Sequence, residues 1–477
     1  MRKVGRIRQI MQEMLSSLQQ HLRSPISRRK AISVGGLGML GLNAPRLMKA
    51  LESKMAHPKA RAKRVIFLFQ FGGPSQLDTF DMKPEAPEEI RGPLKQISSN
   101  VPGMPVCELL PKTAKIMDKV TLVKSVHHTM NNHNSAAYYA LSGHAPPADD
   151  QRLGDTLDLY PAYGSVVEKL APLPDKDIPT HISYPYRIAD GSVTPAQHAS
   201  FLGKQYDPYF FTNDPNAKDF QLPELSLPNG LSPERLASRR EIMKLVDEQS
   251  RLLETSSLAQ GIDAYYEKAL AMLDSQRLRA AFDLSKEPEV VREADGRTTY
   301  GQSCLLARRL AEAGAKFITV YFSKGIGGQS TKDGGWDTHG FNDTRMYKII
   351  DKYHMPITEQ TLPTFLNDMD QRGLLDETLV IWMGEFGRTP KINANKSRDH
   401  WPKCYTVLMA GGGVKRGYAY GASDVHAAYP ADKPVRPDDI SATLFHLLGI
   451  HPYSEIHAAD GRPLPISKGD PIHDIIA

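Results

Sequence analysis

Side chains that can bind a divalent metal follow several apolar stretches of this sequence. They are Asp78, Asp337, His339, Glu385, Asp399 and His400. Carboxylate and imidazole donors without thiolates suit zinc, manganese, calcium or another divalent ion. Two such ions about 4 Å apart would hold the attacking and leaving oxygens of a phosphoryl-type transfer. The residue types therefore predict a site for one or two divalent metal ions.

The same residue types also have ordinary structural interpretations. Asp78 could be a turn residue, and Asp337 with His339 an ordinary pair in a loop. Asp399 and His400 could form a structural hydrogen bond, and Glu385 could form a salt bridge with Arg388. Their occurrence after successive apolar stretches favours the functional interpretation over these alternatives.

Apolar, β-rich runs alternate with helical stretches, which predicts an α/β fold with a largely parallel sheet. The expected strands cover residues 64–71, 120–126, 317–322, 378–383 and 405–410. Several of them are almost continuously apolar, which is typical of central strands buried on both faces. Helices are expected over residues 232–254 and 301–314, and the Pro-rich region 145–231 indicates loops, a subdomain or a lid.

The segments that directly follow the strands are the most informative. Four strands run into "GGPSQLDTFDMKP", "HHTMNNHNSAAYYALSGH", "SKGIGGQSTKDGGWDTHG" and "GEFGRTP", the last followed by "SRDHWP". In open α/β sheets, ligands bind beyond the carboxyl ends of the strands. These segments therefore predict one composite site at one edge of the sheet.

The N-terminal segment, residues 1–62, differs from the rest of the chain and predicts an export signal with a linker. The basic "SPISRRK" precedes 14 uncharged residues, 31–44, too few to cross a bilayer. Paired Arg28 and Arg29 resemble a twin-arginine signal, although Ala31 stands where such signals usually carry Phe. A frayed amphipathic N-terminus is the alternative. We expect a periplasmic or otherwise extracytoplasmic protein without a transmembrane helix, exported by the twin-arginine translocation machinery.

The charge distribution argues against nucleic-acid binding. Residues 1–62 hold 13 of the 59 Lys and Arg and 2 of the 54 Asp and Glu, so residues 63–477 carry 46 basic and 52 acidic side chains. A nucleic-acid binder needs a basic face. The three cysteines, Cys107, Cys304 and Cys404, lie far apart and form no C-x-x-C motif. They predict neither a disulfide framework nor a thiolate zinc site.

Several long motifs, in order, resemble the domain-of-unknown-function 1501 family from residue 64 to the C-terminus. They are "FGGPSQLDTFDMKP", "GWDTHGFND", "LLDETLVIWMGEFGRTPKIN", "RDHWP", "LMAGGGVKRGYAYGASD" and "PDDISATLFHLLGI" with "DGRPLPI". This resemblance implies a branch of the alkaline phosphatase and sulfatase superfamily. It implies a three-layer α/β/α sandwich over residues 63–477, with one or two metals at the strand ends.

Carried over residue by residue, the resemblance implies metal ligands at five positions. Asp78 matches the first carboxylate, Asp337 and His339 the later Asp/His pair, Glu385 the next carboxylate and His400 the last histidine. "NSAAYYALSG" resembles the helix that presents a serine nucleophile, which makes Ser135 the candidate, with His133 as ligand or acid/base. A serine at a helix N-terminus is also an ordinary cap.

This sequence departs from the superfamily pattern in three places. Phe386 follows Glu385 where a histidine is usual, His339 lies only two residues after Asp337, and Cys304 lacks a formylglycine context. The expected function is metal-assisted hydrolysis of a phosphate or sulfate ester, with a polysaccharide or phosphoester as substrate. Arg388 would hold a carboxylate or bind the anionic substrate. The alternatives are a non-catalytic exported protein that binds glycans or a partner, and a cytoplasmic phosphomutase.

Overall fold

The computed structural model describes residues 58–175, 177–220, 271, 275–324, 331, 334–341 and 345–477. Residues 1–57 of the predicted export signal and linker (1–62), and the helix expected at 232–254, lie outside these ranges. The chain divides into two units, and all structure discussed below belongs to the unit Lys59–Ala477. No helix among the described residues is long and apolar enough to cross a membrane.

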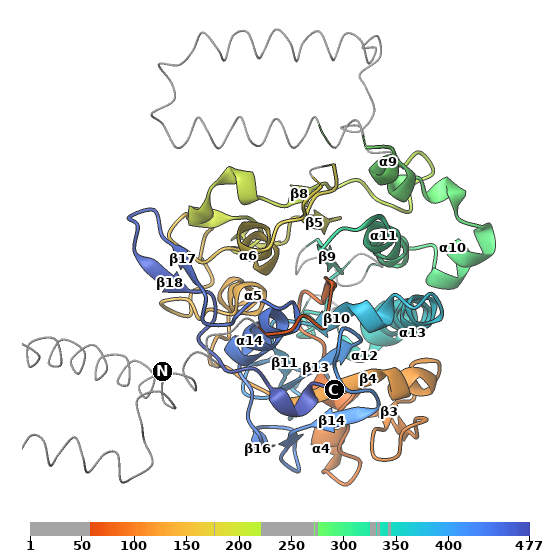
Figure 1. Cartoon of the computed structure of the whole chain (residues 1–477). Coiled ribbons are helices and arrows are strands. Elements are labelled where there is room, and N and C mark those ends of the chain that lie inside the picture. Colours follow the sequence, from red (N-terminus) through yellow and green to blue (C-terminus); the bar gives the residue numbers. More distant parts are fainter. Residues whose placement is uncertain are drawn as a thin grey trace, which may run out of the picture. The chain divides into compact units, whose positions relative to one another are not determined.

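An eight-stranded sheet forms the centre of this unit (Figure 1), with the strand order β14-β4-β13-β10-β1-β9-β5-β8. In chain order the strands are β1 (Arg64–Phe69), β4 (Val120–Val126), β5 (His181–Tyr184), β8 (Tyr209–Phe210), β9 (Phe317–Tyr321), β10 (Thr378–Met383), β13 (Tyr405–Ala410) and β14 (Tyr418–Tyr420). All neighbours pair in parallel except at β13, which is antiparallel to both β10 and β4. The largely parallel sheet is confirmed, and all five predicted strands belong to it.

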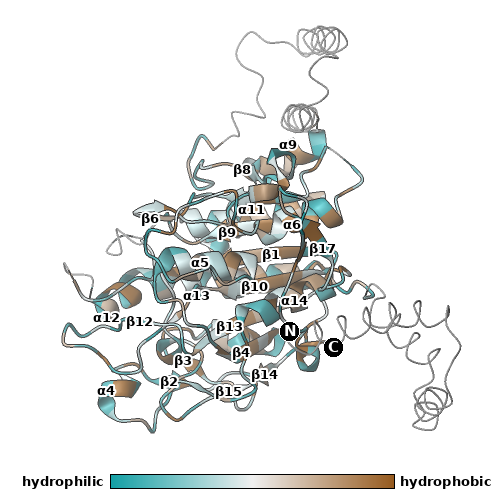
Figure 2. Ribbon diagram, turned by 90° about the vertical axis from the view of Figure 1, so that its left-hand side faces the viewer, coloured by the Kyte–Doolittle hydropathy of each residue, from teal (hydrophilic) through white to brown (hydrophobic). Residues whose placement is uncertain are grey.

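Helices cover both faces of the sheet, as Figures 1 and 2 show. The longer ones are α5 (His133–Ser142), α6 (Tyr163–Leu170), α9 (Gln276–Phe282), α10 (Glu289–Asp295), α11 (Thr299–Ala313), α13 (Met355–Gln371) and α14 (Pro437–Leu447). Helix α11 begins where the Thr298 hydroxyl accepts a hydrogen bond from the Gly301 amide, and it ends at Gly314, which has a left-handed conformation. This helix confirms the one predicted over residues 301–314.

The residues of β1 alternate between the two layers of the core. Ile66 and Leu68 pack in the cluster that includes residues of α11 and α13, while Val65, Phe67 and Phe69 pack in the cluster that includes residues of α5, α6 and α14. All five side chains are buried, because a strand between two helical layers has no face toward water. The fold is therefore the predicted three-layer α/β/α sandwich.

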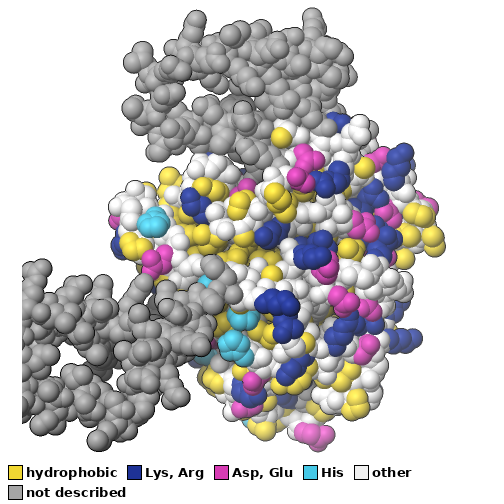
Figure 3. Space-filling model, viewed as in Figure 1, with side chains coloured by type: hydrophobic (Ala, Val, Ile, Leu, Met, Phe, Trp, Pro, Cys, Tyr) yellow, Lys and Arg dark blue, Asp and Glu magenta, His cyan; other side chains and the backbone are white. Residues whose placement is uncertain are grey.

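The Pro-rich region adds regular structure as well as loops. Its described part contains α6, β5 and β8, together with a short hairpin of β6 (Ala189–Asp190) and β7 (Ser192–Val193). Strands β5 and β8 extend the main sheet beyond β9. On the face shown in Figure 3, acidic and basic side chains are interspersed.

Candidate metal centre

The segments that follow the carboxyl ends of β1, β4, β9 and β10 build the candidate site. Helix α5 follows β4, the loop with Asp337 follows β9, and Glu385 follows β10. His400 belongs to the short strand β12 (His400–Trp401), which precedes β13. Because β13 runs antiparallel to β10, its beginning lies at the edge where the parallel strands end. That reversal brings His400 to the same edge.

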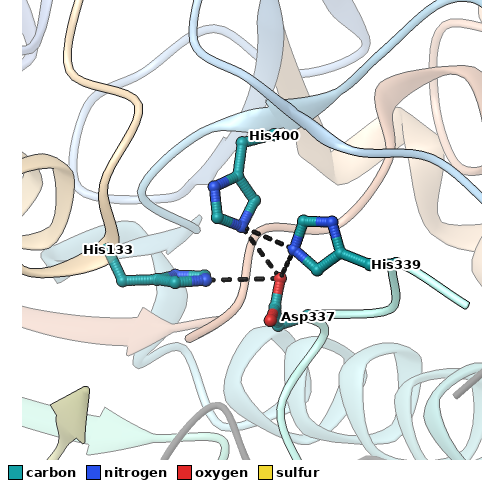
Figure 4. Close-up of side chains that lie close together, drawn as sticks. All are labelled: His133, Asp337, His339 and His400. Carbon is teal, nitrogen blue, oxygen red and sulfur yellow. Dashed lines mark hydrogen bonds and ion pairs between the residues drawn. The ribbon is translucent and has the colours of Figure 1, made fainter. Parts of the chain in front are cut away.

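Four side chains meet there: His133, Asp337, His339 and His400, each offering one ligand atom within 4.8 Å of the others. Figure 4 shows the three imidazole rings around one carboxylate oxygen. Asp337 Oδ1 lies 3.2, 2.7 and 3.0 Å from Nε2 of His133, His339 and His400, respectively. His133 and Asp337 are buried, and the other two histidines are half-buried. Three imidazoles and one carboxylate therefore converge on a small volume.

The opposite nitrogen of each ring contacts an acceptor outside the cluster. His133 Nδ1 lies 2.7 Å from Glu385 Oε1, His339 Nδ1 lies 2.9 Å from Asp399 Oδ1, and His400 Nδ1 lies 2.7 Å from the carbonyl oxygen of Asn131. A carboxylate or carbonyl at Nδ1 holds the proton there and leaves Nε2 as the electron-pair donor. All three rings are thus oriented to present Nε2 to the cluster.

The geometry fits a metal ion. Four ligands at about 2.0–2.1 Å around a tetrahedral ion lie about 3.3 Å from one another. The contacts of Asp337 Oδ1 with the three Nε2 atoms, 2.7 to 3.2 Å, come close to that spacing. In addition, His133 Nε2 is buried, and its 3.2 Å contact with Asp337 Oδ1 is an ion-pair contact and not a hydrogen bond. A buried polar atom of this kind costs free energy unless something binds it.

Charge at the cluster is strongly perturbed. Burial would raise the pKa of Asp337, but Arg388 and the three histidines hold it well below the usual range of a carboxyl group. Burial would lower the pKa of His133, yet the Asp337 and Glu385 carboxylates raise it to about 9. For His400, burial lowers the pKa to about 3 although Asp337 opposes this shift. One anionic carboxylate thus lies among histidines with very different proton affinities.

Arg388 holds the loops together rather than facing a substrate. Its side chain is fully buried and donates to Asp337 Oδ1 at 2.8 Å. The other hydrogen bonds go to carbonyl oxygens of Gly72, Gly73, Trp336 and Arg398. Arg388 was predicted either to hold a carboxylate or to bind the anionic substrate. The structure supports the first role, but the carboxylate that Arg388 holds is Asp337 and not Glu385.

Two glycines after β1 allow the loops to approach closely. A Cβ atom at Gly72 would lie 2.4 Å from the backbone nitrogens of Trp336 and Asp337, and at Gly73 it would lie 2.6 Å from the Phe386 carbonyl oxygen. Both glycines have positive φ, 102° and 75°. The Gly72 amide also donates to Glu385 Oε1 at 2.8 Å. The glycine pair therefore sets the positions of the segments that carry Asp337 and Glu385.

Two of the predicted ligands, Glu385 and Asp399, contact histidines of the cluster from outside it. Glu385 is fully buried, and its Oε1 accepts from the Gly72 amide and contacts His133 Nδ1. Asp399 contacts His339 Nδ1 and accepts from the Asn393 side chain at 3.2 Å. We therefore revise the predicted ligand set, because these carboxylates orient histidines. Both carboxylates lie at the predicted edge of the sheet, behind the histidine rings and not in the cluster itself.

Asp78 lies outside the cluster as well. Its carboxylate contacts Arg398 Nε at 2.8 Å and Ser75 Oγ at 2.5 Å, and Asp78 and Arg398 are both fully buried. The guanidinium of Arg398 also donates to three backbone carbonyls. A buried carboxylate needs a counter-charge, and here Arg398 supplies it. We therefore remove Asp78 from the proposed ligands.

Ser135 is turned into the protein. Its hydroxyl donates to the Asp150 carbonyl oxygen at 2.9 Å and accepts from the Asp150 amide at 2.8 Å. The side chain is fully buried in the first turn of α5. Ser135 thus binds the loop at Asp150 to helix α5. We therefore do not include it among the proposed catalytic groups. His133, two residues earlier, faces the cluster instead.

Sequence reasoning missed several residues that position the site. The Gly72 amide donates to Glu385 Oε1, and the Asn131 carbonyl oxygen lies beside His400 Nδ1. His128 is another, since its Nε2 lies 2.7 Å from the Glu385 carbonyl oxygen, and burial lowers its pKa to about 4. The paired glycines in "FGGPS" were the one usable signal, because adjacent glycines after a strand often mark close backbone approach.

A sandwich of this kind, with a histidine–aspartate cluster at the carboxyl edge of its sheet, defines an α/β protein with a candidate metal centre. Residues 62–476 match the family model described as "Protein of unknown function (DUF1501)". The chain therefore belongs to this family, which confirms the resemblance of its motifs. No curated protein sequence matches the chain at a significant level.

Three solved structures illustrate what the chain is similar to. A lipoteichoic acid synthase from Listeria monocytogenes is 10% identical, with 83% of this chain and 74% of that chain covered and a TM-score of 0.36. The PsFucS1 sulfatase from Pseudoalteromonas sp. is 12% identical, with 95% and 76% covered and a TM-score of 0.37. A protein in the alkaline phosphatase superfamily from Vibrio parahaemolyticus is 11% identical, with 83% and 69% covered and a TM-score of 0.37. Similarities this low carry no argument about function.

Proposed function

We propose that this protein is a metal-dependent hydrolase that acts on a phosphate or sulfate ester. The observation that carries the proposal is the convergence of His133, Asp337, His339 and His400, with an acceptor behind each histidine ring. A bound divalent ion would polarise an ester oxygen and lower the pKa of a bound water. The carboxyl edge of a largely parallel sheet is where α/β proteins commonly bind their ligands.

Different residues would bind the ion, hold its ligands in place and face the substrate. Three Nε2 atoms and the Asp337 carboxylate would hold the ion, while Arg388 keeps that carboxylate ionised and in place. His339 and His400 are the half-buried members, so an ester would reach the cluster from their side. Ser135 and Arg388 are both engaged with the backbone. The proposed attack therefore uses water rather than the Ser135 hydroxyl.

We further propose that the chain is exported through the twin-arginine machinery and works outside the cytoplasm. The paired Arg28 and Arg29 before an uncharged stretch support this location. An extracytoplasmic location favours an anionic ester carried on a polysaccharide as the substrate. Signal cleavage is tested by N-terminal sequencing of the chain recovered from the periplasm, and Arg28→Lys with Arg29→Lys should block export.

The test of the hydrolase is metal content and ester cleavage measured on the same preparations. The full chain, purified without a histidine tag, is assayed with aryl phosphate monoesters, phosphodiesters and sulfate esters. We expect bound metal by plasma mass spectrometry and at least one ester cleaved, with both lost in Asp337→Ala and His400→Ala. A metal-free, folded chain that stays metal-free after incubation with zinc, manganese and calcium contradicts the proposal.

A non-catalytic protein that binds glycans or a partner is the second candidate. The specific observation in its favour is that the predicted nucleophile Ser135 and the predicted anion ligand Arg388 both bond to backbone groups. Binding of sulfated or phosphorylated glycans by the metal-loaded chain, without cleavage of any of them, would favour this candidate.

A further inference from the structure

We propose that the centre takes a single transition-metal ion of the zinc type, rather than calcium or magnesium. This inference rests on the proposed function, because it concerns the same cluster of His133, Asp337, His339 and His400. Three observations support it: the donor atoms of the cluster, the hydrogen-bond acceptors at Nδ1 of its histidines, and the contact of the Arg388 guanidinium with Asp337 Oδ1.

The donor set is rich in nitrogen. Three of the four ligand atoms are imidazole nitrogens and one is a carboxylate oxygen. Calcium takes six to eight oxygen ligands, and magnesium prefers oxygen ligands in a near-octahedral arrangement. Imidazole suits zinc, copper, iron and nickel. A calcium ion here would have to draw most of its ligands from water, whereas a zinc-type ion would find all its protein ligands in place.

The neighbouring carboxylates are committed to the histidines. Oε1 of Glu385 accepts from the Gly72 amide at 2.8 Å and lies 2.7 Å from His133 Nδ1, and the side chain is fully buried. Oδ1 of Asp399 lies 2.9 Å from His339 Nδ1 and 3.2 Å from the Asn393 amide nitrogen. Burying a carboxylate, as at Glu385, is costly unless it is paired; the Asp399 side chain is 48% exposed. Through these contacts Glu385 Oε1 and Asp399 Oδ1 position nitrogen donors from outside the cluster.

Arg388 weakens the attraction for hard cations. Its Nη2 lies 2.8 Å from the same Oδ1 atom that faces the three histidines. The positive charge offsets much of the negative charge that the lone carboxylate offers to an ion. Calcium affinity depends on the number of charged ligands, whereas a transition ion also gains from coordination by imidazole. The guanidinium therefore increases the preference for a transition ion.

The cluster offers ligands for one ion. Two-metal sites hold their ions about 3.5–4 Å apart and need a second set of ligands. Within the ranges that the structure describes, His133, Asp337, His339 and His400 are the only group of three or more suitable side chains. Glu385 and Asp399, which a second ion would need, lie on the outer side of the rings. We therefore expect one equivalent of metal per chain.

The experiment is competitive metal binding to the full chain after removal of metal with a chelator. Zinc and cobalt(II) are titrated by calorimetry, alone and with about a 1,000-fold excess of calcium or magnesium, a range chosen for the strong preference of imidazole for transition ions. We expect one equivalent of zinc or cobalt to bind with its affinity unchanged by the competitor. The cobalt(II) form should show visible absorption typical of low coordination number and nitrogen ligands.

Variants of the positioning residues make the test specific. Glu385→Gln and Asp399→Asn should each weaken zinc binding by about 10- to 100-fold and change the cobalt(II) spectrum. Asp81→Asn is the matched control, because Asp81 is also buried and follows β1 but pairs with Lys83 and Ser423. This control should leave affinity and spectrum unchanged.

The outcomes separate this inference from the proposed function. Displacement of zinc by calcium or magnesium, or two equivalents bound per chain, overturns the inference while ester hydrolysis stands. One tightly bound zinc without cleavage of any ester supports the inference and contradicts the hydrolase. Failure of every ion to bind a folded chain overturns both.

Discussion

Replacing Asp78 with asparagine separates structural from metal-binding carboxylates. The Asp78 carboxylate lies 2.8 Å from Nε and 3.5 Å from Nη2 of Arg398, and both side chains are fully buried. Removing one partner of a buried ion pair typically costs about 3–5 kcal/mol, because the other charge is left without compensation. Three backbone carbonyls still accept from Arg398. We therefore expect a loss near the lower end, about 3 kcal/mol.

This loss converts to a modest change in melting temperature. For the unit Lys59–Ala477, an unfolding entropy of about 2.1 cal/mol/K per residue amounts to about 0.9 kcal/mol/K. A destabilisation of about 3 kcal/mol then lowers Tm by about 3 °C. Differential scanning calorimetry measures this shift, and plasma mass spectrometry on the same sample measures bound metal. We expect Asp78→Asn to keep its metal and Asp337→Asn to lose it.

A double variant serves as the control. Asp78→Leu combined with Arg398→Met removes both charges, and replacing a buried pair by apolar groups is often neutral or even stabilising. It should therefore be more stable than Asp78→Asn. Loss of metal from Asp78→Asn with an unchanged Tm would refute the reasoning, because Asp78 would then be a ligand and not the counter-charge of Arg398.

Three further substitutions test other parts of the structure. Gly72→Ala should abolish metal binding and lower stability, because its Cβ would lie 2.4 Å from backbone nitrogens of the loop after β9; metal content and Tm check this. Ser135→Ala should cost about 1–2 kcal/mol by losing hydrogen bonds to the Asp150 backbone, while any ester cleavage stays within about twofold. A fall in kcat of a thousandfold would restore Ser135 as the nucleophile. Burial, followed by neighbouring carboxylates, raises the pKa of Asp295 from 3.8 to about 7. The folded state therefore keeps a proton that the unfolded state loses, and stability falls between these pH values by up to about 4 kcal/mol. About 3 kcal/mol of this fall lies between pH 5 and pH 8. Urea titrations at these two pH values should show that Asp295→Asn removes most of it, and an equal fall in both proteins would contradict the assignment.

Much of the fold follows from local sequence. The strand runs such as "TLVIWM" are apolar at nearly every position, and only a strand buried on both faces accommodates that pattern in an α/β protein. Parallel strands deliver the segments after them to one edge, so the composite site was predictable as well. The family membership rested on long ordered motifs and needed no structure.

The sequence by itself determined which residue types reach the carboxyl edge of the sheet, but tertiary structure decided what each one does there. Glu385 and His133 both arrive at that edge, and only the packing of the loop at Gly72 places the carboxylate behind the ring. Asp78 became the counter-charge of Arg398, 320 positions away in the chain. Side-chain direction and charge pairing depend on contacts between distant segments, and no local pattern encodes them.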